Sequence, residues 1–178
     1  MPDLSISERL QPALLDRLTD DEPGKELESR EKRVMTIAQL KECVMRDVSW
    51  LLSTIRLSAT EDLSNYPLVS QSVLNFGLPG VAGTSLHQTG AKQAEQQVRE
   101  ALIRYEPRLS PKTLQVRLLE QKGRDTHNMI AYEIEADLFA TPLPHHLFLK
   151  TELDLELGTV HVTEQTEAQR QSNRPRRS

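Results

Sequence analysis

Acidic residues recur at every second position in two stretches of the C-terminal half, and these paired carboxylates are the side chains best suited to chemistry. They are Glu133, Glu135 and Asp137 in the first stretch and Glu152, Asp154 and Glu156 in the second. On neighbouring strands the two sets would lie opposite each other on one face of a sheet. Two carboxyl groups about 5–10 Å apart are what glycoside hydrolysis requires, so a peptidoglycan-cleaving, muramidase-like hydrolase is one hypothesis.

The same pattern argues more strongly for a solvated surface. A glycoside hydrolase needs one carboxyl group in an apolar pocket that raises its pKa, inside a cleft that holds sugar rings. Acidic side chains that alternate outward on a sheet with one face in water supply neither. We therefore expect no catalytic residue here and predict that the protein is not an enzyme.

Other reactive constellations are weaker still. His145 and His146 are adjacent, so in a strand they point to opposite faces and do not share a metal ion. Cys43 is the single cysteine, which excludes an internal disulfide and a cysteine-based metal cluster. Gly77 and Gly80 fit neither a dinucleotide-binding nor a Walker pattern. The sequence predicts no metal and no cofactor.

Composition limits the possible partners. The 22 Lys and Arg against 26 Asp and Glu give a formal net charge of −4, which argues against nucleic acid. No apolar run approaches the roughly 20 residues of a membrane-spanning helix, and the N-terminus, with Asp3 and Glu8, does not resemble a signal peptide. We expect a cytoplasmic protein without direct membrane insertion.

Two stretches show helical spacing of apolar residues. The first, residues 36–57, has a stripe at steps of three or four that comprises Ile37, Leu40, Val44, Val48, Leu51 and Ile55. Thr36 is placed to cap this helix, and Trp50 is expected to pack in the core. The second helix is predicted from about Gln88 to Tyr105. On its exposed face, Glu95 with Arg99 and Glu100 with Arg104 are expected to form ion pairs.

After Pro107 the apolar period changes to two. Four strands are expected, over roughly 114–119, 130–138, 147–155 and 160–162. Short connections make an antiparallel meander. The fold class is therefore α+β, with two main helices packed on one face of a four-stranded antiparallel sheet and a short N-terminal helix.

The chain is expected to form one domain with two extensions. Residues 1–33 contain a short docking helix around Leu10 to Leu18 and a charged linker, residues 34–163 form the domain, and residues 164–178 are predicted to be a disordered tail. Between the helices, residues 58–90 form an ordered loop that carries Phe76, Leu78 and Val81. These apolar side chains either fix the loop to the core or form an interface.

Glu106, Pro107 and Arg108 stand where the second helix ends. Pro107 ends it, because the residue before a proline is driven out of the helical region. Glu106 and Arg108 either pair with each other at the helix terminus or bind a partner. Arginine suits planar, bidentate contacts, and a turn stiffened by proline presents it at low entropic cost, so we expect a docking point.

The last strands also offer an interface. An uncovered edge strand can accept a strand from another chain by main-chain hydrogen bonding, and Lys150 on the penultimate strand is a modest guard against such pairing.

Five stretches, in order, resemble the family of TssE, the baseplate wedge subunit of type VI secretion systems, and the lysozyme-like wedge proteins of contractile phage tails. The stretches are 14–20, 44–52, 66–67 with 72–79, 106–109 and 150–155. The resemblance covers about Leu14 to Thr163.

This resemblance implies a scaffold that lacks catalytic activity. It implies partners in the TssF, TssG and TssK wedge proteins and the TssB and TssC sheath proteins, with the VgrG hub as a further candidate, at the cytoplasmic side of the inner membrane. Glu106, Pro107 and Arg108 would anchor the wedge, and the last strands would seed sheath polymerisation. The expected partner-binding residues are Glu106, Pro107, Arg108, Phe76, Leu78, Leu149, Leu153, Val160 and Val162.

Overall fold

A computed structural model of the chain describes residues 13–19, 24, 35–80, 88–119, 129–139, 144–154 and 159–166. Two long helices dominate it, α2 (Ile37–Ser53) and α4 (Gln88–Tyr105). Thr36 starts α2 as predicted: its hydroxyl accepts a hydrogen bond from the Gln39 N–H, and the Gln39 side chain accepts one from the Thr36 N–H. This reciprocal capping box satisfies donors that the first helical turn leaves free.

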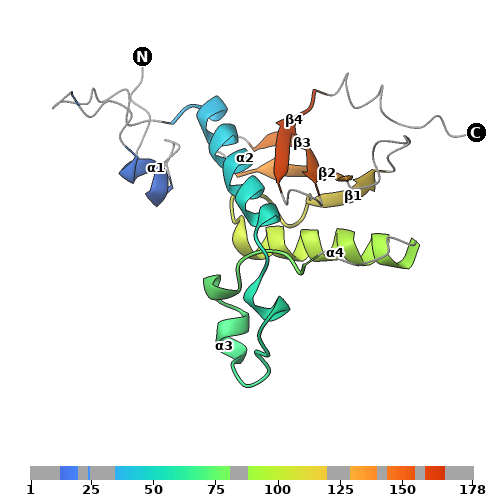
Figure 1. Ribbon diagram of the computed structural model, residues 1–178. Coiled ribbons are helices and arrows are strands. Elements are labelled where there is room, and N and C mark those ends of the chain that lie inside the picture. Colours follow the sequence, from blue (N-terminus) through green and yellow to red (C-terminus); the bar gives the residue numbers. More distant parts are fainter. Residues whose placement is uncertain are drawn as a thin grey trace, which may run out of the picture.

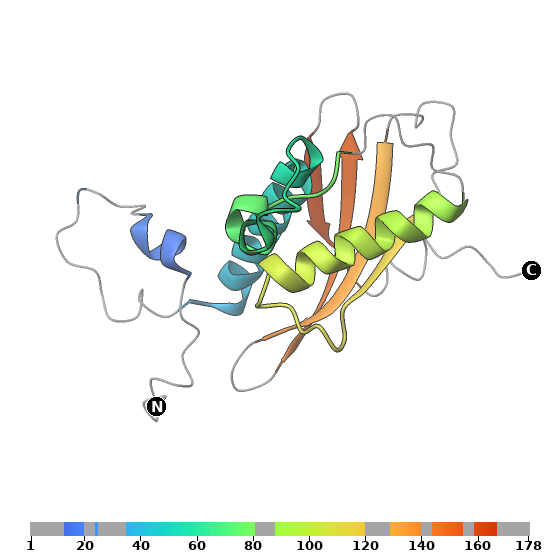
Figure 2. The same cartoon turned by 90° about the horizontal axis from the view of Figure 1, so that it is seen from below.

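The predicted meander is confirmed. Strands β1 (Gln115–Leu119), β2 (Met129–Leu138), β3 (His145–Asp154) and β4 (Val160–Glu164) form one antiparallel sheet in the order β1-β2-β3-β4. Both long helices lie on one face of this sheet (Figures 1 and 2), α2 mainly over β4 and α4 mainly over β1. The predicted α+β class is therefore confirmed.

The core lies between the helices and the inner face of the sheet. Its most deeply buried apolar side chains come from α2, α4, β2, β3 and the turn after α4: Val44, Val48, Leu51, Val98, Leu102, Leu109, Ile134, Leu138, Leu147 and Leu149. Every one of these helical residues belongs to the apolar stripe of its helix. The helical stripes, with a period of 3.6 residues, therefore pack on the apolar face of the sheet, where the period is two residues.

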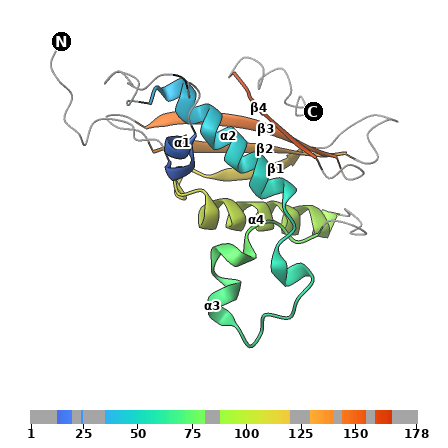
Figure 3. The same cartoon turned by 60° about the vertical axis from the view of Figure 1, so that its left-hand side comes forward.

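Four short elements complete the described chain: α1 (Leu14–Leu18), η2 (Leu57–Ala59), α3 (Pro67–Ser70) and η3 (Val73–Asn75). The segment with η2, α3 and η3 projects away from the sheet beside α4 (Figures 1 and 3). The helix α1 lies beside α2 (Figure 3). No helix among the described residues is long and apolar enough to span a bilayer.

Two expectations for the helices were wrong. Trp50 is 49% exposed, because Leu51 and Leu52 turn toward the core and leave Trp50 at the edge of the stripe, where the Arg46 guanidinium lies 5.0 Å from its ring centroid. Ile55, expected on the buried face, lies beyond the end of α2 and is exposed.

The ion pairs expected along α4 are also absent from the described contacts. Glu95 and Arg99 reach to the region of β1, Glu100 accepts a hydrogen bond from Gln96, and Arg104 donates one to the Ser70 carbonyl. Main-chain groups of neighbouring elements compete successfully with a weak exposed ion pair.

An ion pair joins α2 to the end of β4. Glu164, expected in the tail, is the last residue of β4, and its carboxylate lies 2.5 Å from the Lys41 ammonium on α2. The predicted tail from residue 167 onwards lies outside the described residues, as do Leu10 and Val81.

Candidate functional site

Glu106 occupies the C-terminal end of α4, where the chain turns toward the sheet. Its N–H donates to the Leu102 carbonyl at 2.9 Å and so completes the last helical turn. Pro107 has no N–H to continue the pattern. The Leu109 N–H then donates to the Glu106 carbonyl at 3.1 Å, which closes the turn around Pro107.

The residues after Pro107 are fixed to the end of β2. The Phe139 N–H donates to the Arg108 carbonyl at 2.7 Å, and the Ser110 N–H donates to the Asp137 carbonyl at 2.8 Å. Between them the buried Leu109 faces Leu138 in an isolated antiparallel bridge. The backbone of Arg108 is therefore held by the sheet.

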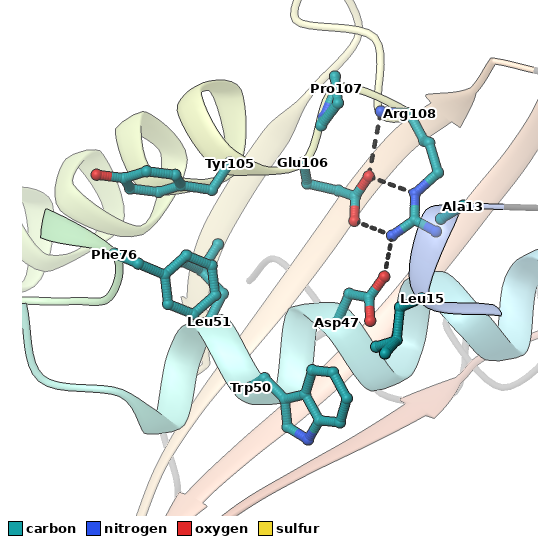
Figure 4. A pocket seen from close by; sticks show the side chains of 10 residues that line it. All are labelled: Ala13, Leu15, Asp47, Trp50, Leu51, Phe76, Tyr105, Glu106, Pro107 and Arg108. Carbon is teal, nitrogen blue, oxygen red and sulfur yellow. Dashed lines mark hydrogen bonds and ion pairs between the residues drawn. The ribbon is translucent and has the colours of Figure 1, made fainter. Parts of the chain in front are cut away.

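The side chains of Glu106 and Arg108 bind each other in a bidentate ion pair (Figure 4). The Arg108 guanidinium donates from Nε to Glu106 Oε1 at 2.6 Å and from Nη2 to Oε2 at 2.5 Å, and the Arg108 N–H donates to Oε1 at 3.1 Å. Glu106 is buried. A bidentate, charge-assisted pair of this kind fixes the plane of the guanidinium as well as its position.

Asp47 on α2 is the third member; it lies within stretch 44–52, but no sequence pattern connects it with Arg108. Arg108 Nη2 also donates to Asp47 Oδ2 at 2.5 Å, while the neighbouring Arg46 donates from Nε to Asp47 Oδ1 at 2.9 Å. Arg108 thus links the end of α4 to the middle of α2. Burial disfavours the charged form of Arg108, but its contacts with Glu106 and Asp47 outweigh this effect and raise its pKa above the ordinary value.

The same network holds α1. Arg46 Nη1 lies 2.8 Å from Asp16 Oδ1, and the Asp16 carboxylate also accepts from the Ala13 N–H at 3.2 Å. Burial opposes ionisation of Asp16, yet the contacts with Arg46 and Cys43 prevail and lower its pKa. Burial and the adjacent Asp16 raise the pKa of the Cys43 thiol, so this cysteine is poorly suited to act as a nucleophile.

A pocket of about 530 Å³ lies beside this network (Figure 4). Its walls are mostly apolar and come from α1, α2, α4 and the segment before Leu78; they include Leu15, Trp50, Leu51, Phe76, Tyr105 and Pro107. Asp47, Glu106 and Arg108 line the polar part. The Arg108 Nη1 atom is buried and has no hydrogen-bond acceptor among the described residues. The pocket therefore combines apolar walls with a polar edge made by Asp47, Glu106 and Arg108.

The remaining predicted contact residues divide by burial. Leu78, Leu149, Leu153 and Val160 are buried in the core, so their side chains offer no surface to a partner. Phe76 is partly buried and makes an edge-to-face contact with Tyr105, with centroids 5.3 Å apart, and both rings line the pocket. In this loop, the buried Leu78 and the partly buried Phe76 fix the chain to the core, whereas Leu68, Val73 and Leu74 are exposed.

The sheet has two edges, and β3, which was expected to face a partner, is at neither: it lies between β2 and β4. In β4, Thr159 and Gln165 bond toward β3, so the alternation of an antiparallel ladder points the main-chain groups of Val160, Val162 and Glu164 outward. The Val160 carbonyl accepts from the Ser49 hydroxyl at 3.0 Å. No described residue bonds the outward N–H of Val162.

The opposite edge, β1, is partly capped by α4. The Leu118 N–H donates to Glu95 Oε1 at 2.7 Å, and Arg99 donates from Nε to the Leu114 carbonyl at 3.3 Å, just before β1 begins. Side chains thereby occupy main-chain groups with which an added strand would pair. The two edges of the sheet therefore differ in degree: α4 holds the Leu118 N–H and the Leu114 carbonyl at β1, whereas no described residue bonds the outward main-chain groups of Val116 or the N–H of Val162.

The outer face corrects the expected carboxylate pairs. In the observed register Glu133 faces Lys150, Glu135 faces Phe148 and Asp137 faces His146, so the two acidic sets do not lie opposite each other. Glu156 lies outside the described residues.

His146 lies between two carboxylates of this face. It bonds Asp137 through Nδ1 and lies 3.1 Å from Glu135 through Nε2. The hydrogen bond to Asp137, with a smaller contribution from Glu135, raises the pKa of His146. No group of three or more His, Cys, Asp or Glu side chains in the described ranges is arranged to hold a metal ion.

Comparisons with known proteins point to one family. Residues 38–143 match the family model described as baseplate wedge protein gp25. No curated protein is similar enough to count as a match. A candidate tail lysozyme from Geobacter sulfurreducens, known from a crystal structure, is similar with a TM-score of 0.43 and 19% sequence identity over 76% of this chain and 99% of that one.

Proposed function

Because the chain belongs to the family of baseplate wedge protein gp25, we propose that it is the TssE-type wedge subunit of a type VI secretion baseplate, where it anchors wedge proteins and seeds the sheath. It works as a scaffold at the cytoplasmic side of the inner membrane. Its partners in this proposal are the TssF, TssG and TssK proteins on one side and the TssB and TssC sheath proteins on the other.

The observation that carries the anchoring role is the Arg108 network beside an apolar pocket. Glu106 and Asp47 hold the guanidinium from two sides, so its orientation costs little entropy when a partner binds. Pro107 stiffens the turn that presents Arg108, and Asp47, Glu106 and Arg108 form the polar part of the pocket lining. Trp50 and Phe76 provide the apolar area next to it.

Copurification with TssF and TssG tests the anchor. Arg108→Lys keeps the charge but not the two-pronged geometry, and Trp50→Ala removes an exposed wall of the pocket; both are expected to lower the yield of the complex. Arg117→Lys, on the outer face and half exposed, is the control and is expected to change nothing. Undiminished association of both pocket variants, with folding verified by circular dichroism, would remove Arg108 from the interface.

Seeding of the sheath is supported by the contrast between the sheet edges. A strand from a sheath protein can extend the ladder at β4, where the main chain of Val162 points outward, but meets Glu95 and Arg99 at β1. Val162→Pro removes the outward donor without breaking a bond to β3. We expect this variant to lose the ability to start TssB–TssC assembly, while Val162→Thr, which keeps the N–H, retains it. Normal seeding by a folded proline variant would contradict the strand-addition mechanism.

A catalytic role finds little support in the site. Both carboxylates in the pocket, Glu106 and Asp47, are engaged by arginine donors, whereas a glycosidase acid is a protonated carboxyl group in an apolar site. On the outer face Glu133 and Glu152 are offset in register. We expect the purified protein not to cleave peptidoglycan, and cleavage that disappears in Glu133→Gln or Glu152→Gln would overturn the scaffold proposal.

A further inference from the structure

The segment from Thr54 to Gly80 leaves the body of the protein and returns to it through a narrow neck. At the neck the Arg56 N–H donates to the Leu78 carbonyl and the Leu78 N–H donates to the Thr54 carbonyl, both at 2.8 Å. Gly77 closes it with φ of 119°, and a Cβ atom there would lie 2.4 Å from the Thr54 oxygen. The ends of the segment are thus held together, as in a compact surface loop.

Polar contacts order the inside of the segment. The buried Asn75 accepts from the Ser58 N–H through Oδ1 and donates through Nδ2 to the Ser70 carbonyl, each at 2.9 Å. The Tyr105 hydroxyl of α4 lies 3.1 Å from the Ser72 carbonyl and 2.8 Å from the Asn75 carbonyl. These bonds join its two sides to each other and to α4, so the segment keeps its shape without a partner.

Part of the outer surface of this ordered segment, around α3 and η3, is apolar, while exposed residues before the start of α3, such as Glu61 and Asp62, are polar. Leu68 is 84% exposed and Val73 is 77% exposed, and Tyr66 and Leu74 are also mostly exposed. A hydrophobic cluster on the projecting part of a domain typically marks a binding surface. Because the backbone that carries these side chains is already fixed, binding costs little ordering entropy.

A cationic pocket lies at the base of the apolar residues. It has a volume of about 110 Å³, suited to a single small group, and Arg56 and Arg104 line it together with Glu100. Neither arginine forms an ion pair with a described carboxylate, and the Arg56 Nε atom is buried without an acceptor. Glu100 accepts from Gln96, and Asp62, on the same projecting segment, accepts from Ser64. Two guanidinium groups therefore face one carboxylate, which favours an incoming acidic side chain.

We propose that residues 54–80 form a third docking surface, separate from Arg108 and from β4, for a partner protein with an apolar groove and an acidic rim. The groove receives Leu68, Val73 and Leu74, and an Asp or Glu side chain at its rim enters the pocket between Arg56 and Arg104. The projecting shape explains why the partner supplies the concave surface (Figure 3). Arg104 contacts the segment directly at the Ser70 carbonyl, so the apolar and cationic parts lie side by side.

Site-specific photocrosslinking in the bacterium that produces the apparatus tests this surface. A photoreactive phenylalanine analogue at position 68 or 74 of the full chain is expected to crosslink to the same segment of the partner protein. If that segment is helical, an acidic residue of the partner is expected within about four positions of the crosslinked residue. The control position is Phe139, which is 75% exposed and lies next to the end of β2. A crosslink there to the same segment, no crosslink at 68 and 74, or a crosslink to a segment without acidic residues would overturn the proposal.

Charge reversal then tests the pocket. Arg104→Glu is expected to lower the crosslink yield at position 68 about tenfold or more, and a Lys in place of the acidic partner residue is expected to restore it. Arg104→Gln, which keeps a donor for Ser70, separates loss of charge from loss of structure, and unchanged thermal unfolding verifies the fold. Undiminished crosslinking in Arg104→Glu would refute the role of the pocket. Because Arg108 and Val162 are intact throughout, these results stand independently of the wedge and sheath experiments.

Discussion

Glu106 accepts three hydrogen bonds from Arg108 and none of its carboxylate faces open solvent. A residue that sequence patterns present as a charged surface group therefore has a structural role, because it fixes the side chain of Arg108. Of the two readings of the motif, the structure shows the first, since Glu106 and Arg108 bind each other; the docking role stays a proposal.

The first prediction concerns this pair. Glu106→Ala is expected to lower the free energy of unfolding by about 3 kcal/mol, because it leaves a largely buried guanidinium with one carboxylate in place of two. Asp47→Ala is expected to cost less, about 1 kcal/mol, since Asp47 is more exposed and Glu106 still holds Arg108. Urea denaturation measures both values, and equal costs would contradict the dominance of Glu106.

The second prediction concerns pH. The folded pKa of His146 is raised above the ordinary value of 6.5 by Asp137 and Glu135, so its contacts stabilise the fold fully below pH 6.5 and are lost as pH rises through the folded pKa. The stability difference between the wild type and His146→Asn is therefore expected to be largest in mildly acidic solution and to shrink above neutrality.

Thermal unfolding across this pH range measures the difference, and His145→Asn is the matched control, since His145 has no carboxylate partner among the described residues. A difference that grows with rising pH would have the wrong sign for these contacts.

At the residue scale, the sequence identified the motif but not its environment. Pro107 and the charges beside it are visible in the chain, whereas Asp47 lies 61 positions from Arg108 and joins the site only because α2 and α4 pack side by side. Helical periodicity likewise led to the wrong prediction that Trp50 packs in the core, since a side chain at the margin of an apolar stripe can lie inside or outside the core.

Among the elements, the projecting segment is the one whose conformation depends on a single residue type. Gly77 adopts a positive φ in close contact with Thr54. Sequence reasoning recognised an ordered loop here, but it assigned Phe76 and Leu78 to the possible interface. The φ value of Gly77 directs Leu78 inward, and such a choice of side is invisible in a loop without periodicity.

The third prediction tests this lock. Gly77→Ala is expected to cost at least about 1 kcal/mol of stability, because a methyl group collides with main-chain atoms and the backbone conformation is unfavourable for alanine. Gly80→Ala is the control: its Cβ would lie 4.0 Å from the Ile55 side chain, in ordinary contact, and a change within about 0.5 kcal/mol is expected. Chemical denaturation compares the two, and equal tolerance would mean that the neck adapts.

In the whole molecule, the four strands and the helix layer were predictable because the apolar period of each element was long and uninterrupted, whereas the strand order β1-β2-β3-β4 comes from the structure. The bonds that α4 makes at the β1 edge were not predictable in this way. Glu95 and Arg99 were expected to pair with each other at i,i+4 spacing, and only the packing of α4 against β1 shows that they bond to main-chain groups instead.

The fourth prediction follows from the unequal edges. The amide hydrogen of Leu118 is expected to exchange at least about tenfold more slowly than that of Val162, because Glu95 holds the first and no described residue holds the second. Glu95→Ala is expected to accelerate exchange at Leu118 alone. Hydrogen exchange followed by NMR measures both amides, and strong protection of Val162 would show that its edge is closed.

The unequal edges also bear on valence. A sheet with two free edges could bind a strand on each side and pass the ladder on through copies of itself, so it would polymerise. Glu95 and Arg99 hold two main-chain groups at the β1 edge, so in the proposed mechanism a strand is expected to add at β4. Strand addition at that edge alone would make the chain monovalent, able to begin a ladder but not to continue one.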